Sequence, residues 1–83
     1  MPLYMDIHNE IEGLTGDAVA QCHARDVEVG PSHGVNYISY WYDDKHGKVF
    51  CLVEAPNAEA ATAVHREAHG LVADEITEVQ QGA

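Results

Sequence analysis

Basic residues are scarce in this chain. Its 83 residues include 4 Lys and Arg against 14 Asp and Glu, which gives a formal net charge of −10. Binding to nucleic acid draws much of its energy from Lys and Arg at phosphates, so this composition argues against a nucleic-acid partner. The same negative field repels anionic membranes and attracts cations. We therefore expect neither nucleic acid nor a membrane as a partner.

Long apolar runs and cysteines are also few. No stretch approaches the roughly 20 apolar residues of a membrane-spanning helix. Met1–Leu14 contains several acidic residues and lacks the basic start and apolar centre of a secretion signal. Two cysteines, Cys22 and Cys51, are too few for a disulfide framework. We therefore expect free thiols and a cytoplasmic location.

Motifs of known catalytic chemistry are missing as well. The sequence contains no nucleophile elbow, phosphate-binding loop or dinucleotide-binding fingerprint. It has no Cys-x-x-Cys pair, so a closed structural zinc site is not expected. A histidine acid–base remains open, because imidazole titrates near neutral pH with little tuning. The sequence therefore supports an enzyme less than a binding protein.

Hydrophobic periodicity and turn residues predict alternating strands and helices. The expected strands are residues 2–8, 35–43, 48–54 and 75–79, and the expected helices are residues 15–27 and 58–69. The order β-α-β-β-α-β is that of the ferredoxin-like α+β fold, an antiparallel four-stranded sheet of order 4-1-3-2 with both helices on one face. We therefore predict a single ferredoxin-like domain of residues 1–83.

The first predicted strand alternates two sets of side chains: Leu3, Met5 and Ile7 in one, and Tyr4, Asp6 and His8 in the other. Because apolar residues usually pack the core, we expect the second set on the open face of the sheet, together with aromatic residues of 37–42. An uncovered aromatic face on a small domain is an association surface. A face-to-face homodimer is the simplest way to cover it, and such a dimer could complete metal sites between subunits.

Two histidines, His65 and His69, stand four residues apart near the end of the second predicted helix. This spacing puts both imidazoles on one helix face, roughly 5–6 Å apart at Cβ, so one metal ion could take two nitrogen ligands. Gly70 is expected to end the helix. We therefore expect the pair on the last turn, facing solvent. In a chain with 6 histidines, chance placement of two surface residues is the competing interpretation.

The predicted topology brings His8 to the same edge of the domain as His65 and His69. Asp6 lies roughly 6–7 Å along the strand from His8 and on the same face. These two residues could equally form a simple hydrogen-bonded pair. Cys51 is expected near the middle of the neighbouring strand, apart from the edge group, and a buried core thiol is its simpler role. Imidazole, carboxylate and thiolate ligands suit nickel, zinc or copper better than magnesium or calcium.

Four other residues receive no ligand role: Cys22, His23, His33 and His46. His23 falls on the packing face of the first helix, where a satisfied interior or interface histidine is expected. His33 and His46 fall in predicted loops, where solvation is the simplest expectation.

Four segments carry a resemblance to a known family: Met-Asp-Ile-His at 5–8, Tyr-Ile-Ser-Tyr-Trp-Tyr at 37–42, Val-Phe-Cys-Leu-Val-Glu-Ala-Pro at 49–56 and Val-His-Arg-Glu-Ala-His-Gly-Leu at 64–71. Over residues 2–79 the chain resembles the small nickel-binding, nickel-responsive bacterial proteins once described as a domain of unknown function. The resemblance implies a ferredoxin-like fold, a homodimer and bound nickel. The ligands it implies are Asp6, His8, Cys51, His65 and His69.

We therefore predict a cytoplasmic homodimer that binds nickel for sequestration, storage or sensing and is not an enzyme; zinc or copper are possible alternative ions. Two other functions stay open. A small dimeric α+β-barrel enzyme would use His8 or His65 as acid–base, and a closed apolar pocket between helices and sheet would favour it. A metal-free protein-interaction module would be favoured by an exposed sheet face and monomeric behaviour.

Overall fold

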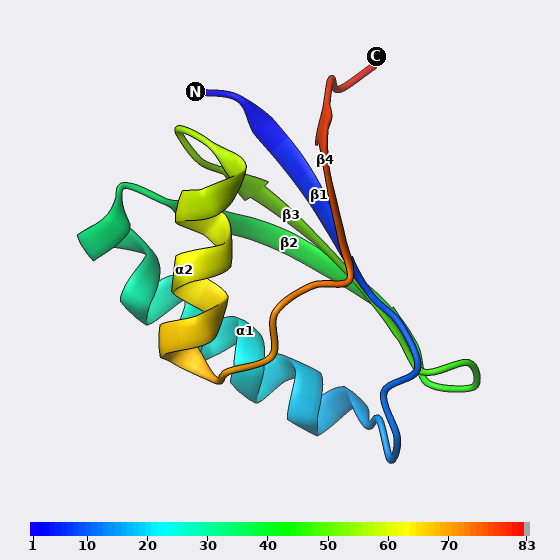
Figure 1. Ribbon diagram of the computed structural model, residues 1–83. Coiled ribbons are helices and arrows are strands. Elements are labelled where there is room, and N and C mark those ends of the chain that lie inside the picture. The colour runs from blue at the N-terminus through cyan, green and yellow to red at the C-terminus, as the bar shows by residue number, and fades with distance from the viewer. Residues whose placement is uncertain (83) are drawn as a thin grey trace.

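An antiparallel sheet carries both helices on one face (Figure 1). The computed structural model describes residues 1–82, so Ala83 of the predicted domain lies outside this range. The elements are β1 (Leu3–His8), α1 (Gly16–Val29), the 3-10 helix η1 (Gly30–His33), β2 (Asn36–Asp43), β3 (Lys48–Glu54), α2 (Ala58–Ala68) and β4 (Glu75–Val79). The strands lie in the order β2-β3-β1-β4. The predicted ferredoxin-like α+β fold is confirmed.

Polar caps fix where both helices begin. The Thr15 hydroxyl accepts the Ala18 N–H at 3.2 Å, and Asn57 Oδ1 accepts the Ala60 N–H at 2.8 Å. At the end of α2, Gly70 adopts a φ of +80°, and its N–H donates to the carbonyl of His65 at 2.9 Å. Within residues 1–82 no helix is both long and apolar enough to cross a membrane.

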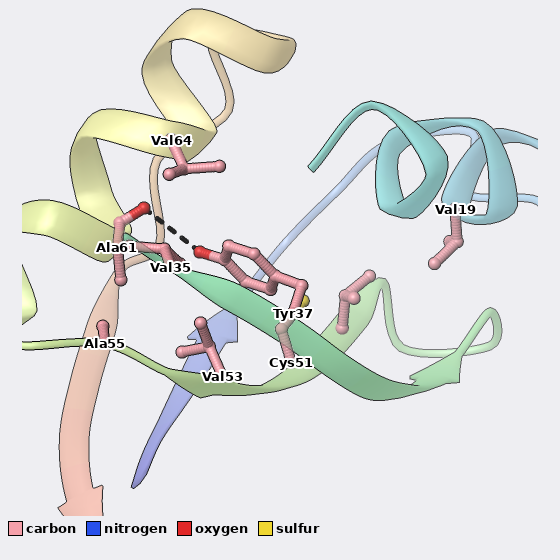
Figure 2. Packing of buried hydrophobic residues seen from close by; sticks show 9 residues of the cluster. Val19, Val35, Tyr37, Cys51, Val53, Ala55, Ala61 and Val64 are labelled. Carbon is pink, nitrogen blue, oxygen red and sulfur yellow. Dashed lines mark hydrogen bonds between the residues drawn. The ribbon is translucent and has the colours of Figure 1, made fainter. Parts of the chain in front are cut away.

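The hydrophobic core fills the space between the helices and the inner face of the sheet (Figure 2). Val53 on β3 and Ala61 and Val64 on α2 are fully buried. Tyr37 on β2 reaches across this layer, and its hydroxyl donates to the carbonyl of Ala61 at 3.1 Å, the dashed line in Figure 2. This bond fixes the height of α2 above the sheet.

β1 faces the opposite way from the prediction. Asp6 is 0% exposed and His8 7% exposed, so both lie on the inner face beneath the helices. The register agrees, because Asp6 is paired with Cys51 and His8 with Val49, both of them buried. The prediction was wrong because it assumed that the apolar set would pack the core, whereas the inner face here is partly filled by partnered polar groups.

The open face of the sheet is therefore built from the apolar set of β1 and its neighbours. Met5 is paired with Leu52, and Ile7 with Phe50. Phe50 is also paired with Trp41, whose side chain is 52% exposed. This contiguous group, Met5, Ile7, Trp41, Phe50 and Leu52, is called the open-face patch below.

Candidate metal centre

His65 is the centre of a buried polar cluster and is 1% exposed. α2 directs it inward because Ala61, Val64 and Ala68, at neighbouring helical positions, are buried as well. His65 Nε2 lies 2.9 Å from Asp6 Oδ2 on β1, and Nδ1 lies 2.9 Å from Asp26 Oδ1 on α1. An ionised carboxylate can only accept, so both ring nitrogens donate and His65 is an imidazolium.

The charges of His65, Asp6 and Asp26 stabilise one another. Burial alone would lower the pKa of His65, but its hydrogen bonds to Asp26 and Asp6 and their charges raise it to about 9. Burial alone would raise the pKa of Asp6, but the hydrogen bond from His65 and the adjacent ring of His8 lower it to about 2. Asp26 also has a lowered pKa, because hydrogen bonds from His65 and His69 outweigh its burial. In the metal-free protein at neutral pH, one cation therefore lies between two anions.

One group of potential ligands lies on the β1 side of His65. Ligand atoms of Asp6, His8, Cys51 and His65 lie within 4.8 Å of one another, and all these residues are buried. His8 Nε2 is 3.3 Å from Asp6 Oδ1. That carboxylate oxygen nonetheless has no partner of good hydrogen-bond geometry among the described residues. Burial, followed by the charge of Asp6, raises the pKa of the Cys51 thiol, so the thiol is protonated before any metal binds.

A second group lies on the α1 side and shares His65. Its members are Asp26, His65 and His69. His69 Nε2 is 3.1 Å from Asp26 Oδ1. His69 Nδ1 accepts the N–H of Leu71 at 3.1 Å, so the ring proton of a neutral His69 is on Nε2.

The structure revises two expectations about the site. His65 and His69 do not face solvent on the last turn: His65 is buried, and His69 is half-buried just beyond α2. Cys51 does not lie apart from the histidines, since its paired residue Asp6 hydrogen-bonds to His65. The first error came from assuming that the last turn of a helix meets solvent, and the second from placing Cys51 by its height along β3 alone. In the structure the polar set of β1 faces α2 and joins both positions.

Two residues of the cluster are missing from the predicted set, Asp26 and Tyr37. Asp26 follows His23 by three residues and Cys22 by four, so it shares the packing face of α1, and an acid on a packing face is a detectable signal. Tyr37 is 3% exposed, and its hydroxyl lies 3.4 Å from Asp6 Oδ2. Its aromatic strand context gave no hint of this polar role.

The other histidines lie outside both groups. His33 Nε2 is 2.9 Å from Glu67 Oε2, and His46 Nδ1 is 2.7 Å from Asp43 Oδ2, both at the surface. His23 packs its ring against Tyr40 with centroids 4.7 Å apart. Its buried Nδ1 has no hydrogen-bond partner within residues 1–82, so of the expected interior or interface histidine, the satisfied interior alternative is not met.

The four residues of the β1-side group fit a borderline transition metal ion. Two ligands on opposite sides of one ion, each at roughly 2.1 Å, are roughly 4.2 Å apart. The ligand atoms of this group all lie within 4.8 Å of one another, so small side-chain shifts would bring them around one ion. Imidazole, thiolate and carboxylate together favour nickel, zinc or copper. The unpartnered oxygen of Asp6 adds a buried acceptor that a cation would satisfy.

Fold and cluster together define a class of protein: a small ferredoxin-like domain that buries a cluster of potential metal ligands between its sheet and helices. The family described as "Nickel responsive protein SCO4226-like" matches residues 4–79. The crystal structure of SCO4226 from Streptomyces coelicolor A3(2) is similar, with 40% sequence identity, a TM-score of 0.90, and coverage of 98% of this chain and 99% of that one. No curated protein matches significantly. The chain belongs to the SCO4226-like nickel responsive family, as the resemblance indicated.

Proposed function

We propose that this protein binds a nickel ion inside the fold, with Asp6, His8, Cys51 and His65 as its ligands. The observation that carries the proposal is the convergence of these four buried donors around one point. The family description, "Nickel responsive protein", supports nickel as the ion. Zinc and copper suit the same donors, and copper stands above nickel in intrinsic affinity, so availability in the cell selects among them.

His65 limits the cluster to one ion at a time. A neutral imidazole offers one nitrogen to a metal and keeps a proton on the other. With Nε2 on the ion, the Nδ1–H continues to donate to Asp26 Oδ1, now 2.9 Å away. A carboxylate behind a ligating histidine orients the ring and raises its basicity. Asp26 is therefore proposed as the positioning residue of the site.

The α1-side group is the weaker site for nickel. It offers three residues rather than four. Its His69 keeps the proton on Nε2, the atom that faces Asp26, because Leu71 donates to Nδ1. Coordination through Nε2 would require that proton to leave and the Leu71 contact to break. We therefore assign His69, a predicted ligand, to this secondary group.

The proposed role is sequestration, storage or sensing of nickel in the cytoplasm by a homodimer, without catalysis. The open-face patch supports the dimer, because it leaves a contiguous apolar surface with Trp41 half exposed. An enzyme with His65 as general base is disfavoured, because both of its ring nitrogens are bound to carboxylates and its pKa is raised to about 9. A metal-free interaction module is disfavoured as well, because it would give the buried β1-side group of potential ligands no role.

Calorimetric titration of chelator-stripped protein with nickel, zinc and copper at pH 7.5 tests the proposal. Cys51→Ser and His8→Ala should each weaken nickel binding roughly 100-fold or more, since even outer partners of metal ligands cost 10–100-fold. His46→Ala, which removes a surface histidine, should leave it unchanged, and melting temperatures verify folding. Unchanged binding in the double variant His65→Ala/His69→Ala would refute the buried site.

A further inference from the structure

A cavity of about 130 Å³ opens beside the polar cluster. It lies between α1, β3 and the loops that follow β1 and α2. Its walls are mainly apolar, formed by Ile11, Leu14, Val19, Val49 and Leu71. An apolar cavity of roughly 150 Å³ in another protein accommodates benzene. The space is therefore large enough for a single aromatic ring and too small for a nucleotide or a peptide side chain with its backbone.

The cavity also has an aromatic wall and a polar floor. His23 and Tyr40 both line it, with their rings 4.7 Å apart, and provide a surface on which a flat ring can pack. Asp26 lines the floor and is 2% exposed. Its carboxylate has about four acceptor positions, of which His65 and His69 occupy part. Asp26 can therefore accept one more hydrogen bond from a guest.

The charges of the lining residues further narrow the class of molecule that the cavity can bind. Among the lining residues, all within 1–82, there is no Lys or Arg, and the His65 imidazolium is already paired with Asp6 and Asp26. Glu12 and Asp26 would repel an anion. A cation is not required either, because the His65 imidazolium already faces Asp26. An uncharged ring with a single donor matches both the walls and the floor.

We propose that this cavity binds a small uncharged aromatic molecule that carries one N–H or O–H donor, which points at Asp26. The ring packs between the apolar walls and the His23–Tyr40 pair. Three of the proposed nickel ligands, His8, Cys51 and His65, also line this cavity, so the proposal concerns the metal-free protein and is tested there.

The test uses metal-free, isotope-labelled protein titrated with pyrrole and with furan, followed by amide chemical shifts in NMR. The two rings have nearly the same size, but only pyrrole has an N–H donor. We expect saturable pyrrole shifts around the cavity and at least tenfold weaker binding of furan. Equal binding of both rings would overturn the role of Asp26, and no saturable shifts with either would overturn the site.

A matched pair of variants locates the binding. Ala18 and Ala20 are both exposed on α1, but only Ala18 lines the cavity. Ala18→Leu should weaken pyrrole binding at least tenfold, whereas Ala20→Leu should leave it unchanged. Cys22→Leu, a second change in the lining, should act as Ala18→Leu does if the latter fails to fold. Unchanged binding in a folded, occluded variant would overturn the proposal.

Discussion

His65 differs from an ordinary core histidine because each ring nitrogen has a buried carboxylate as its partner. Desolvating three charged groups is costly, and the cost is offset only while all three stay paired. Removing the middle group would leave Asp6 and Asp26 buried and facing each other. A substitution of His65 should therefore destabilise the fold by about 3–5 kcal/mol, more than a surface histidine change.

The stability of the metal-free protein should have a maximum between about pH 4 and 6.5. Asp6 and Asp26 have lowered pKa values, about 2 for Asp6, so their contribution is present above the unfolded value of about 3.9 and is lost as the pH falls. His65 has a pKa raised to about 9, so its contribution is complete below the unfolded value of about 6.5 and is lost as the pH rises through 9.

Urea unfolding from pH 3 to 10 measures this profile. His65→Gln should abolish the decline between pH 6.5 and 9, because the group that loses its proton there is gone. His46→Gln is the control, since His46 pairs with Asp43 at the surface and should leave the alkaline decline in place. An alkaline decline that persists in His65→Gln would contradict the charged state of His65.

Nickel binding should weaken as the pH falls from 9, rather than only below about pH 6 as free imidazoles suggest. The ion must displace a proton from His65, whose pKa is about 9, and another from the Cys51 thiol, whose pKa is raised. Calorimetry in buffers of different ionisation enthalpy counts the protons released. About two protons per ion are expected near pH 7.5, because both groups are protonated there before nickel binds, and release of none would show that these two groups are not ligands.

At the scale of single residues, the sequence predicted the chemical type of the candidate ligands better than their positions in the fold. Asp6, His8, Cys51 and His65 are among the ligands that the family resemblance implied, and the structure places these four together. Their orientation could not be predicted, because strand alternation separates two faces without saying which one is buried. Asp26 was missed because an acid in an amphipathic helix is usually solvated. Its burial is offset by its hydrogen bond with His65 on α2, which the sequence of α1 alone does not indicate.

At the scale of elements, prediction was more successful, because each boundary has a local cause. Thr15 and Asn57 both cap their helices, and the predicted helices, residues 15–27 and 58–69, begin at or directly after these caps. The strand bounds of β3 and β4 agree with those predicted. The 3-10 helix η1 lies between a predicted helix and a predicted strand, where no element was predicted, since proline and glycine signal an interruption but not its shape.

The end of α2 depends on the backbone of Gly70. Its φ of +80° is unfavourable for other residues, while a Cβ there would meet nothing within 4 Å. Gly70→Ala should therefore lower the free energy of unfolding by about 1 kcal/mol through backbone strain alone. Gly82→Ala, equally open and without a positive φ, should change it by less than about 0.5 kcal/mol. Equal effects in urea unfolding would contradict this role.

At the scale of the whole molecule, association sets apolar contact against charge repulsion. The open-face patch favours face-to-face pairing of two sheets, yet each protomer carries a formal charge of −10. Repulsion between exposed charges is screened over about 10 Å at 0.1 M salt. The proposed homodimer should therefore dissociate more readily at low ionic strength, which sedimentation equilibrium across a salt series measures.

Leu52→Glu provides the sharpest test of this dimer, because Leu52 lies opposite Met5 at the centre of the patch. Pairing two sheets would then bury two facing carboxylates, so the variant should be monomeric at concentrations where the unmodified chain is dimeric. Ala20→Glu on α1 adds the same charge at an exposed helical position, away from the sheet. If both variants dissociate alike, net charge rather than the patch controls assembly; if neither does, the protomers associate through another surface.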